Sequence, residues 1–315
     1  MGNRLVMKLR VADMRAETPD VLGLRLEHPR RPSLPAWSAG AHVDVHLPHG
    51  GIRQYSLCGD PEDLGHYQIA VKREHLGRGG STWLHEHLRA GTELPVSAPR
   101  NHFRLDPQAG PHLLIAGGIG VTPIAAMART LKRRGTAFRL HYCARDQAHA
   151  PLLADLEAVC GAELTTWLSA DDRRLDPIAV LGAATGARLY VCGPRRLTDA
   201  VEQAALALGW PAERFHAERF TALEDADFRP EPFEAVIASS GARLQVPAER
   251  SLLSVLADNG IAPDSSCEIG VCGACECGYL EGEVVHRDVV LGPDDRATRL
   301  MTCVSRGKGT IILDL

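Results

Sequence analysis

The sequence of 315 residues lacks any long hydrophobic run. No apolar stretch reaches the roughly 18 residues that indicate a membrane-spanning helix. The segment Met1–Arg10 has no apolar core of the kind found in secretory signal peptides. Val6 stands where an N-myristoylation signal requires Ser or Thr. These absences predict a cytoplasmic protein that does not bind a membrane.

A strong excess of charge of either sign is also missing. The formal net charge is −4, from 35 Lys and Arg against 39 Asp and Glu, which excludes the basic footprint of a nucleic-acid-binding protein. Residues 233–315 carry 12 Asp and Glu against 7 Lys and Arg. That local acidic excess fits electrostatic attraction of a basic partner, and it fits an ordinary solvated surface equally well.

Four cysteines near the C-terminus follow a spacing that is typical of metal-cluster ligands. Cys267, Cys272 and Cys275 follow the spacing C-x4-C-x2-C, and Cys303 lies downstream. This is the pattern of plant-type [2Fe–2S] ligation, in which each iron takes two thiolates besides the bridging sulfides. Disulfides are rare inside cells, and zinc sites usually show paired C-x2-C motifs. Cys277 leaves a shifted register open, although the spacing favours Cys275 as the ligand and Cys277 as a small buried hydrophobe.

The first hundred residues alternate short apolar stretches with Gly and Pro turns, which favours an antiparallel barrel or sandwich. Within them, the segment Arg53–Leu57 (RQYSL) offers a guanidinium for a phosphate and an aromatic face for a ring. The turn Gly77–Ser81 (GRGGS) precedes a predicted helix, Thr82–Leu88, with Ser81 as its N-cap, and helix N-termini bind anions. Together these features predict a phosphate-bearing aromatic ligand; a plain loop-to-helix cap is the alternative for the turn alone.

A strand, glycine turn and helix pattern begins at His112. The apolar run His112–Ala116 leads into Gly117–Pro123 (GGIGVTP) and a helical stretch, Ile124–Arg133, as in nucleotide-binding folds. Pro123 takes the place of the third glycine of G-x-G-x-x-G, so the dinucleotide fingerprint is incomplete. Predicted strands and helices keep alternating to residue 208, which indicates a doubly wound parallel sheet. Cys192–Pro194 falls at the carboxyl end of a predicted strand, where such sheets bind ligands.

The C-terminal part begins after a polar, acidic and proline-containing stretch, Thr221–Pro232, which indicates a linker. Phe233–Ser239 and Arg243–Val246 predict a hairpin, and Ser251–Asp258 predicts a helix ended by Asn259-Gly260. A strand is predicted at Thr310–Leu313, giving a small α+β module around the cysteine loop. The predicted organisation is a barrel domain at 1–104, an α/β domain at 105–222, a linker at 223–232 and a ferredoxin-like domain at 233–315.

Six motifs in this order resemble the phthalate dioxygenase reductase family, which includes vanillate demethylase reductases and lies within the ferredoxin–NADP reductase superfamily. They are Arg53-x-Tyr55-Ser56-Leu57, Gly79-Gly80-Ser81, Gly117–Pro123, Cys192-Gly193-Pro194, Glu218-x-Phe220 and the four cysteines. The resemblance covers almost the whole chain. It implies an FMN-binding antiparallel β-barrel, an NAD-binding doubly wound α/β domain and a plant-type ferredoxin domain of the α+β, β-grasp class.

The resemblance also implies roles for individual residues. Flavin contacts are expected at Arg53, Tyr55, Ser56, Leu57, Ala70, Val71, Lys72, Gly79, Gly80 and Ser81. Nucleotide contacts are expected at Gly117, Gly118, Thr122, Cys192, Gly193 and Pro194. Phe220 is expected to cover the flavin until nicotinamide displaces it, and Glu218 to complete the nicotinamide site. The expected catalytic group is Ser56, Cys192, Glu218 and Phe220, with Ser56 and Cys192 as positioning groups or, alternatively, as small packing residues. The expected cluster ligands are Cys267, Cys272, Cys275 and Cys303.

The function implied is transfer of a hydride from NADH to FMN, followed by release of single electrons through the cluster. The expected acceptor is a separate terminal oxygenase, a Rieske non-haem iron oxygenase or demethylase acting on an aromatic acid. A cytochrome P450 partner and a non-catalytic redox sensor are the alternatives, and the chain is expected to be a monomer. NADH is expected because acidic neighbours would repel a 2′-phosphate from the available arginines. Those arginines are Arg145, Arg173 and Arg174, beside Asp146, Asp171 and Asp172.

Overall fold

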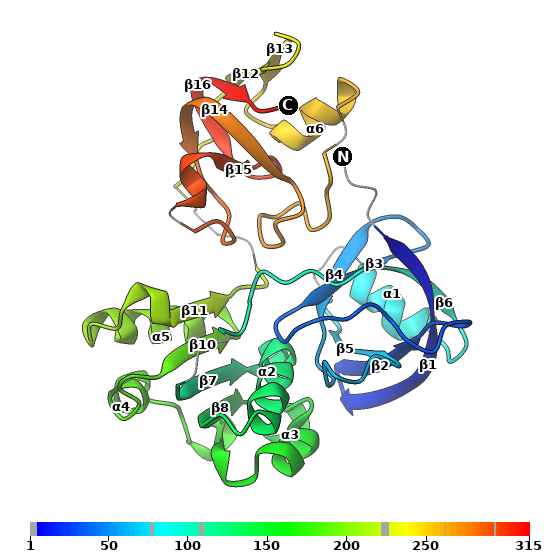
Figure 1. The fold of residues 1–315 in the computed structure, drawn as a ribbon, viewed down its shortest axis with the longest axis vertical. Coiled ribbons are helices and arrows are strands. Elements are labelled where there is room, and N and C mark those ends of the chain that lie inside the picture. The colour runs from blue at the N-terminus through cyan, green and yellow to red at the C-terminus, as the bar shows by residue number, and fades with distance from the viewer. Residues whose placement is uncertain (1–4, 76–78, 107–109, 222–226, 262, 293) are drawn as a thin grey trace. The chain divides into compact units, whose positions relative to one another are not determined.

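The structure is a computed structural model that describes residues 5–75, 79–106, 110–221, 227–261, 263–292 and 294–315. The chain separates into two units, Met1–Arg219 and Phe220–Leu315, drawn in Figure 1. The predicted boundary at residue 104 falls inside the first unit, between a barrel and a layered α/β part. None of the helices in the described ranges combines the length and apolarity needed to cross a bilayer.

An antiparallel six-stranded sheet forms the barrel, in the order β4-β3-β6-β1-β2-β5. Its strands are β1 (Val6–Thr18), β2 (Val21–Glu27), β3 (His42–His46), β4 (Ile52–Ser56), β5 (Tyr67–Lys72) and β6 (Glu93–Ser97). A bridge between Leu57 and Ile69 joins the two ends of this order, so the sheet closes on itself. Alternate residues of β1, such as Leu9 and Val11, are fully buried in the barrel core. Helix α1 (Gly80–His87) places Leu84 in the same core. The predicted antiparallel barrel is confirmed.

A parallel five-stranded sheet follows, in the order β11-β10-β7-β8-β9. The strands are β7 (His112–Gly117), β8 (Phe138–Ala144), β9 (Leu164–Leu168), β10 (Arg188–Cys192) and β11 (Phe215–Glu218). Helices α2 (Val121–Arg133) and α3 (Leu153–Cys160) pack on one face, and α4 (Pro177–Gly182) and α5 (Arg195–Ala207) on the other. From β7 the chain adds β8 and β9 on one side of the sheet and then β10 and β11 on the other side. The order of the strands therefore reverses between β7 and β10, and doubly wound sheets bind ligands at such a point. The doubly wound prediction is confirmed.

A buried apolar cluster holds the barrel and the α/β part together. Ala39, Cys58 and Phe103 of the barrel side belong to the same cluster as Val121 and Ile124 of α2. Because these side chains are shielded from water only when the two parts meet, burial of apolar area favours one joint unit.

The second unit is a mixed five-stranded sheet with one helix. Its strands are β12 (Phe233–Ile237), β13 (Arg243–Val246), β14 (Glu276–Val285), β15 (Arg299–Met301) and β16 (Arg306–Leu313), in the order β13-β12-β16-β14-β15. Among the described residues of this sheet, β12 and β16 are the one parallel pair. Helix α6 (Leu252–Asp258) buries Leu252, Val255 and Leu256 against this sheet, and Ser251 caps it through its hydroxyl. The predicted α+β module is confirmed. Short 3-10 turns occur at Gly118–Gly120 (η1), Gln147–His149 (η2), Gly161–Glu163 (η3), Ser169–Asp171 (η4), Ala212–Arg214 (η5) and Asp295–Ala297 (η6).

Two local expectations were wrong or incomplete. The N-cap of α1 is Gly79, with φ of 77°, and not Ser81. A left-handed φ suits glycine, so the helix starts two residues early, and the Ser81 hydroxyl instead accepts the Glu74 N–H at 3.0 Å. The sequence also did not predict β14, because Gly278 and Gly282 interrupt its alternation; Gly282 has φ of 111° beside a register shift against β16.

The described end of the predicted linker is bound to the second unit. The Phe228 ring lies 3.7 Å from the Arg287 guanidinium carbon. The Glu231 carbonyl accepts from Arg306 at 2.7 Å. Residues 222–226 of the linker lie outside the described residues.

Candidate functional site

The residues expected to bind flavin gather where β4 and β5 meet at the seam of the barrel. Arg53, Tyr55 and Ser56 come from β4, and Leu57 bridges to Ile69 of β5. Ala70, Val71 and Lys72 end β5. The backbone closure of the barrel therefore brings together two segments that are separate in the sequence.

The N-terminus of α1 lies against Arg53. A Cβ atom on Gly80 would fall 2.6 Å from Arg53 Nε and 2.8 Å from Leu47 Cδ1. The absence of a side chain at Gly80 therefore makes room for Arg53 in its present conformation. Arg53 Nη1 donates to the Ile52 carbonyl at 2.8 Å. A guanidinium beside the first N–H groups of a helix is a cradle for a phosphate. Gly79, Gly80 and Arg53 thus fit the phosphate end of a flavin mononucleotide.

A cavity of about 700 Å³ opens beside the carboxyl ends of β7, β8 and β9. That volume lies in the range of small-molecule sites. Its lining includes predicted residues Gly117, Gly118, Pro194 and Lys72. It also includes residues that sequence reasoning did not assign, namely Asp20, Val21, Cys143, His149, Trp167, Arg196 and Leu197. Cys143 and Trp167 lie at the carboxyl ends of β8 and β9, and His149, Arg196 and Leu197 follow β8 and β10, which is the signal that would have found them.

Backbone-to-backbone packing shapes the floor of this site. A Cβ on Gly193 would lie 3.0 Å from Gly117 Cα, and one on Gly120 would lie 2.5 Å from the Cys192 carbonyl. The turn after β7 and the end of β10 therefore approach as closely as they do because glycines occupy them. Thr122 is 3% exposed and donates its hydroxyl to the Ile119 carbonyl at 3.0 Å. Its hydroxyl closes the turn and does not line the cavity.

Cys192 and Glu218 form a buried pair on adjacent strands. They are register partners of β10 and β11, and Cys192 Sγ lies 3.9 Å from Glu218 Oε2. Glu218 is partly exposed as a residue, but protein atoms surround its carboxyl group, and this desolvation raises the pKa of Glu218 to about 8. Desolvation likewise raises the pKa of the Cys192 thiol. Both shifts favour the protonated forms.

Ser56 and Phe220 complete the expected catalytic group. Ser56 is 7% exposed at the end of β4. Phe220 is 38% exposed and is the first residue of the second unit. The roles assigned to Ser56, Cys192, Glu218 and Phe220 stay predictions.

We expect Glu218 to make stability depend on pH. A carboxyl group whose pKa is higher in the folded state stabilises the fold below its unfolded pKa, and this contribution is lost as pH rises through the folded pKa. For Glu218 that window runs from the ordinary pKa of 4.5 to about 8. Relative to Glu218→Gln, the wild-type free energy of unfolding should fall by up to about 1.4 kcal/mol per pH unit across it. Thermal unfolding of both proteins from pH 5 to 9 checks this, and a constant difference between them would contradict it.

The four expected cluster ligands form two pairs of thiols in the second unit. The Cys267 and Cys272 side chains contact each other, and this contact lowers the pKa of Cys267. The Cys303 thiol donates to the Cys275 sulfur and lowers the pKa of Cys275. Within the described residues, no three His, Cys, Asp or Glu side chains are grouped as a single-ion site would need. Two pairs match a two-iron cluster, since each iron takes two thiolates.

The loop backbone also suits such a cluster. The Ile269 N–H donates to Cys267 Sγ, and the Ala274 N–H to Cys272 Sγ, each at 3.4 Å. Hydrogen bonds of this kind to the sulfurs tune the potential of a cluster. Gly270 and Gly273 have φ of 75° and 70°, which lets the loop turn back on itself.

Cys277 lies in a different environment from the four thiols. It belongs to β14, packs in the core cluster that includes Phe233 and Leu313, and donates its thiol to the Gly278 carbonyl at 3.2 Å. Burial raises the pKa of Cys277 to about 12. The structure therefore supports Cys275 as the ligand and Cys277 as a packing residue.

Comparison with known proteins agrees with this modular arrangement. Residues 236–308 match the family model of the 2Fe–2S iron-sulfur cluster binding domain, and residues 96–215 match that of the N-terminal domain of a DmmA-like dimethylamine monooxygenase subunit. The chain is 41% identical to the heme-dependent oxidative N-demethylase beta subunit of Ectopseudomonas mendocina, over 98% of this chain and 99% of that protein.

Two solved structures extend over the same residues. Phthalate dioxygenase reductase, described as a modular structure for electron transfer from pyridine nucleotides to [2Fe–2S], is 36% identical, with a TM-score of 0.73 and 98% coverage of both chains. An intact type IV self-sufficient cytochrome P450 monooxygenase is 37% identical, with a TM-score of 0.90 over 98% of this chain and 41% of that one.

Fold, thiol pairs and comparisons together define an iron–sulfur oxidoreductase, the electron-transfer component of an oxygenase system. More narrowly, the chain belongs to the phthalate dioxygenase reductase family. The predicted family and enzyme class are confirmed, and so is the predicted [2Fe–2S] domain.

Proposed function

We propose that this protein takes a hydride from NADH onto FMN and passes single electrons through its [2Fe–2S] cluster to a separate terminal oxygenase. The observation that carries the proposal is the 700 Å³ cavity, which Lys72, Asp20 and Val21 of the barrel line together with Gly117 and Gly118 of the α/β part. A nucleotide bound at the switch point therefore borders the barrel that cradles the flavin. Holding two reactants side by side is the main task of a protein in hydride transfer.

The bound flavin supplies the conversion from a two-electron donor to a one-electron acceptor. The chain supplies position and electrostatics. Arg53 and the N-terminus of α1 hold the phosphate end, and the turn after β7 admits the nucleotide backbone. The resemblance assigns Glu218 to the nicotinamide site. Its carboxyl lies beside Cys192 at the end of β11, and the raised pKa favours the neutral form, which can donate a hydrogen bond.

NADPH is a second candidate donor, because of where the arginines lie. Arg145 Nε donates to Asp146 at 3.0 Å. Arg173 and Arg174 line the cavity without a carboxylate partner in the described part of the chain, whereas Asp171 and Asp172 do not line it. Of these three arginines, Arg145 is the one that pairs with its acidic neighbour in the described part of the chain. NADH is favoured by the resemblance, and a 2′-phosphate would find two available guanidinium groups.

A Rieske non-haem iron oxygenase or demethylase acting on an aromatic acid is the partner that we propose. The relatives also support a second candidate partner, a haem oxygenase. The Ectopseudomonas mendocina relative is the beta subunit of a heme-dependent oxidative N-demethylase, and the similar region of the type IV protein belongs to a self-sufficient cytochrome P450 monooxygenase. A non-catalytic sensor would not sustain turnover. The monomeric state and the cytoplasmic location stay predictions.

The test uses the purified full chain under anaerobic conditions. We expect about two irons per chain, release of FMN on denaturation, and bleaching of the flavin by NADH. Failure of both NADH and NADPH to bleach the flavin would contradict the proposal. The ratio of kcat/KM for the two nucleotides, with ferricyanide as acceptor, decides the donor. Substrate-dependent NADH consumption with a purified Rieske oxygenase, compared with a purified P450, decides the partner, and steady turnover eliminates the sensor.

A further inference from the structure

The loop between β8 and α3 lines the nucleotide cavity from one side. Arg145, His149 and Pro151 of this loop face the cavity. The loop ends at Leu152, whose φ is 60°. A left-handed conformation is unfavourable for a residue with a branched side chain, so it persists only where the surroundings hold it. Leu152 is also the N-cap residue of α3 and is 2% exposed.

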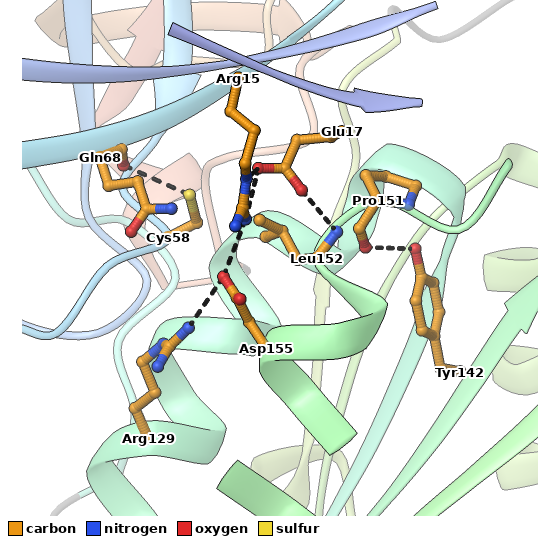
Figure 2. A network of polar contacts seen from close by, with 9 residues as sticks. All are labelled: Arg15, Glu17, Cys58, Gln68, Arg129, Tyr142, Pro151, Leu152 and Asp155. Atoms are coloured by element: carbon orange, nitrogen blue, oxygen red, sulfur yellow. Dashed lines mark hydrogen bonds and ion pairs between the residues drawn. The ribbon is translucent and has the colours of Figure 1, made fainter. Parts of the chain in front are cut away.

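The Leu152 N–H is held from the barrel. It donates to Glu17 Oε2 at 3.3 Å, across 135 residues of sequence (Figure 2). The preceding carbonyl, that of Pro151, accepts the Tyr142 hydroxyl at 2.9 Å. Two side chains from different elements therefore hold the C=O and the N–H of one peptide group, that between Pro151 and Leu152, at the end of the cavity loop.

An irregularity in strand β1 of the barrel directs the Glu17 side chain toward Leu152. The register of β1 against β2 shifts between Ala16 and Thr18, so Glu17 sits in a bulge. Bulges redirect a side chain out of the regular alternation of a strand. A Cβ atom on Gly23 of β2 would lie 2.7 Å from Glu17 Oε1, so the absence of a side chain there makes room for the carboxylate.

Charged neighbours hold the Glu17 carboxylate in place. Its side chain is 6% exposed, and Arg15 Nη2 lies 2.7 Å from Oε1. The same Arg15 nitrogen reaches Asp155 of α3 at 3.1 Å, and Arg129 of α2 lies 3.7 Å from that carboxylate. Figure 2 shows Arg15, Glu17 and Asp155 turned toward one another between the barrel strand and α3. A buried carboxylate paired in this way is a rigid acceptor for the Leu152 N–H.

We propose that Glu17 is a positioning residue for nucleotide binding: from the flavin barrel, it holds Leu152 left-handed and so keeps the loop of residues 145–152 in its cavity-lining form. This inference rests on the proposed nucleotide oxidation. Without the carboxylate, the loop relaxes to other conformations, and nucleotide binding must restore the lining form. The apparent dissociation constant then equals the intrinsic constant divided by the fraction of molecules whose loop has the cavity-lining form. The geometry of the bound state is unchanged.

The main test is Glu17→Ala in the full chain loaded with flavin and cluster. The dissociation constant of NAD⁺, measured by calorimetry, and the KM for NADH should both rise about tenfold, with kcat within about twofold of wild type. Hydrogen exchange at residues 145–152 should become faster. Glu17→Gln keeps an oxygen that can accept from Leu152 but loses its charge toward Arg15, so we expect a smaller rise of about threefold.

Asp60→Asn is the matched control. Asp60 of the barrel pairs with Arg133 of α2, and it is 44% exposed and does not line the cavity. It links the same two parts of the unit, so its loss should leave the NAD⁺ dissociation constant unchanged.

Three outcomes would overturn the inference. They are an unchanged dissociation constant in Glu17→Ala, a fall in kcat at constant KM, and an equal rise in Asp60→Asn. If Glu17→Ala fails to retain flavin and iron, Glu17→Gln decides, and an unchanged constant there also overturns the inference. A wild-type protein that neither binds NAD⁺ nor oxidises NADH would instead remove the proposed function. Hydrogen exchange in the variants would still test the contact of Glu17 with Leu152.

Discussion

Replacement of Cys303 by serine is expected to lower cytochrome c reduction by about 100-fold or more, while NADH still bleaches the flavin at the wild-type rate. Cys303 is 8% exposed and lies beside Cys275 as one of the two thiol pairs. Cys303 is the expected fourth ligand, and loss of its thiolate would leave one iron with a single thiolate, so we expect electron transfer out of the cluster to fail. The flavin and the nucleotide cavity belong to the other unit and keep their residues. Stopped-flow absorbance of the flavin and steady-state cytochrome c assays measure the two steps separately.

Cys277→Ser is the matched control for this experiment. Serine can make the same bond to the Gly278 carbonyl, and Cys277 packs in the core cluster away from the thiol pairs. We expect this variant to keep its iron and its cytochrome c activity, with some loss of stability from a buried hydroxyl. Loss of iron in Cys277→Ser together with retention in Cys275→Ser would show that the ligand register is the shifted one.

Replacement of Gly120 by alanine is expected to reduce kcat/KM for NADH by about 100-fold. The added Cβ would lie 2.5 Å from both the carbon and the oxygen of the Cys192 carbonyl, and 2.6 Å from Gly193 N. These are backbone atoms of a central strand and its turn, so they cannot move aside as a flexible side chain can. The turn after β7 must separate from the end of β10, which displaces the residues that line the cavity. Overpacking of this kind also destabilises a fold by about 1–3 kcal/mol.

Gly182→Ala provides the control for the glycine substitution. Gly182 ends α4, and no atom beyond its chain neighbours and its own helix lies within 4 Å of an added Cβ. Alanine is also the better helix former. We expect wild-type kinetics and unchanged flavin content in this variant. Steady-state oxidation of NADH with ferricyanide, which bypasses the cluster, measures both variants. Wild-type kcat/KM in Gly120→Ala would show that the close approach of the two turns does not shape the nucleotide site.

Local signals in the sequence determined the three-part organisation and most of the secondary structure. Alternating apolar residues, glycine turns and the C-x4-C-x2-C spacing each act over a few residues, so they can be interpreted without knowledge of the fold. They located the turn after β7, the hairpin of β12 and β13, helix α6 and the cysteine loop. They misplaced the start of α1 by two residues, because the left-handed conformation of Gly79 depends on how the chain enters the barrel.

Only the tertiary structure decided which side chains meet. Cys275 and Cys277 have similar sequence contexts, but Cys275 lies in the turn before β14, beside Cys303, whereas Cys277 lies in β14 and packs in the core. Arg173 and Arg174 line the cavity although their acidic neighbours Asp171 and Asp172 do not. The contact of Glu17 with Leu152 has no sequence signature at all, because a bulge in one strand and a left-handed residue 135 positions later produce it. Long-range contacts depend on the closure of a whole sheet, and no local pattern of residues contains that information.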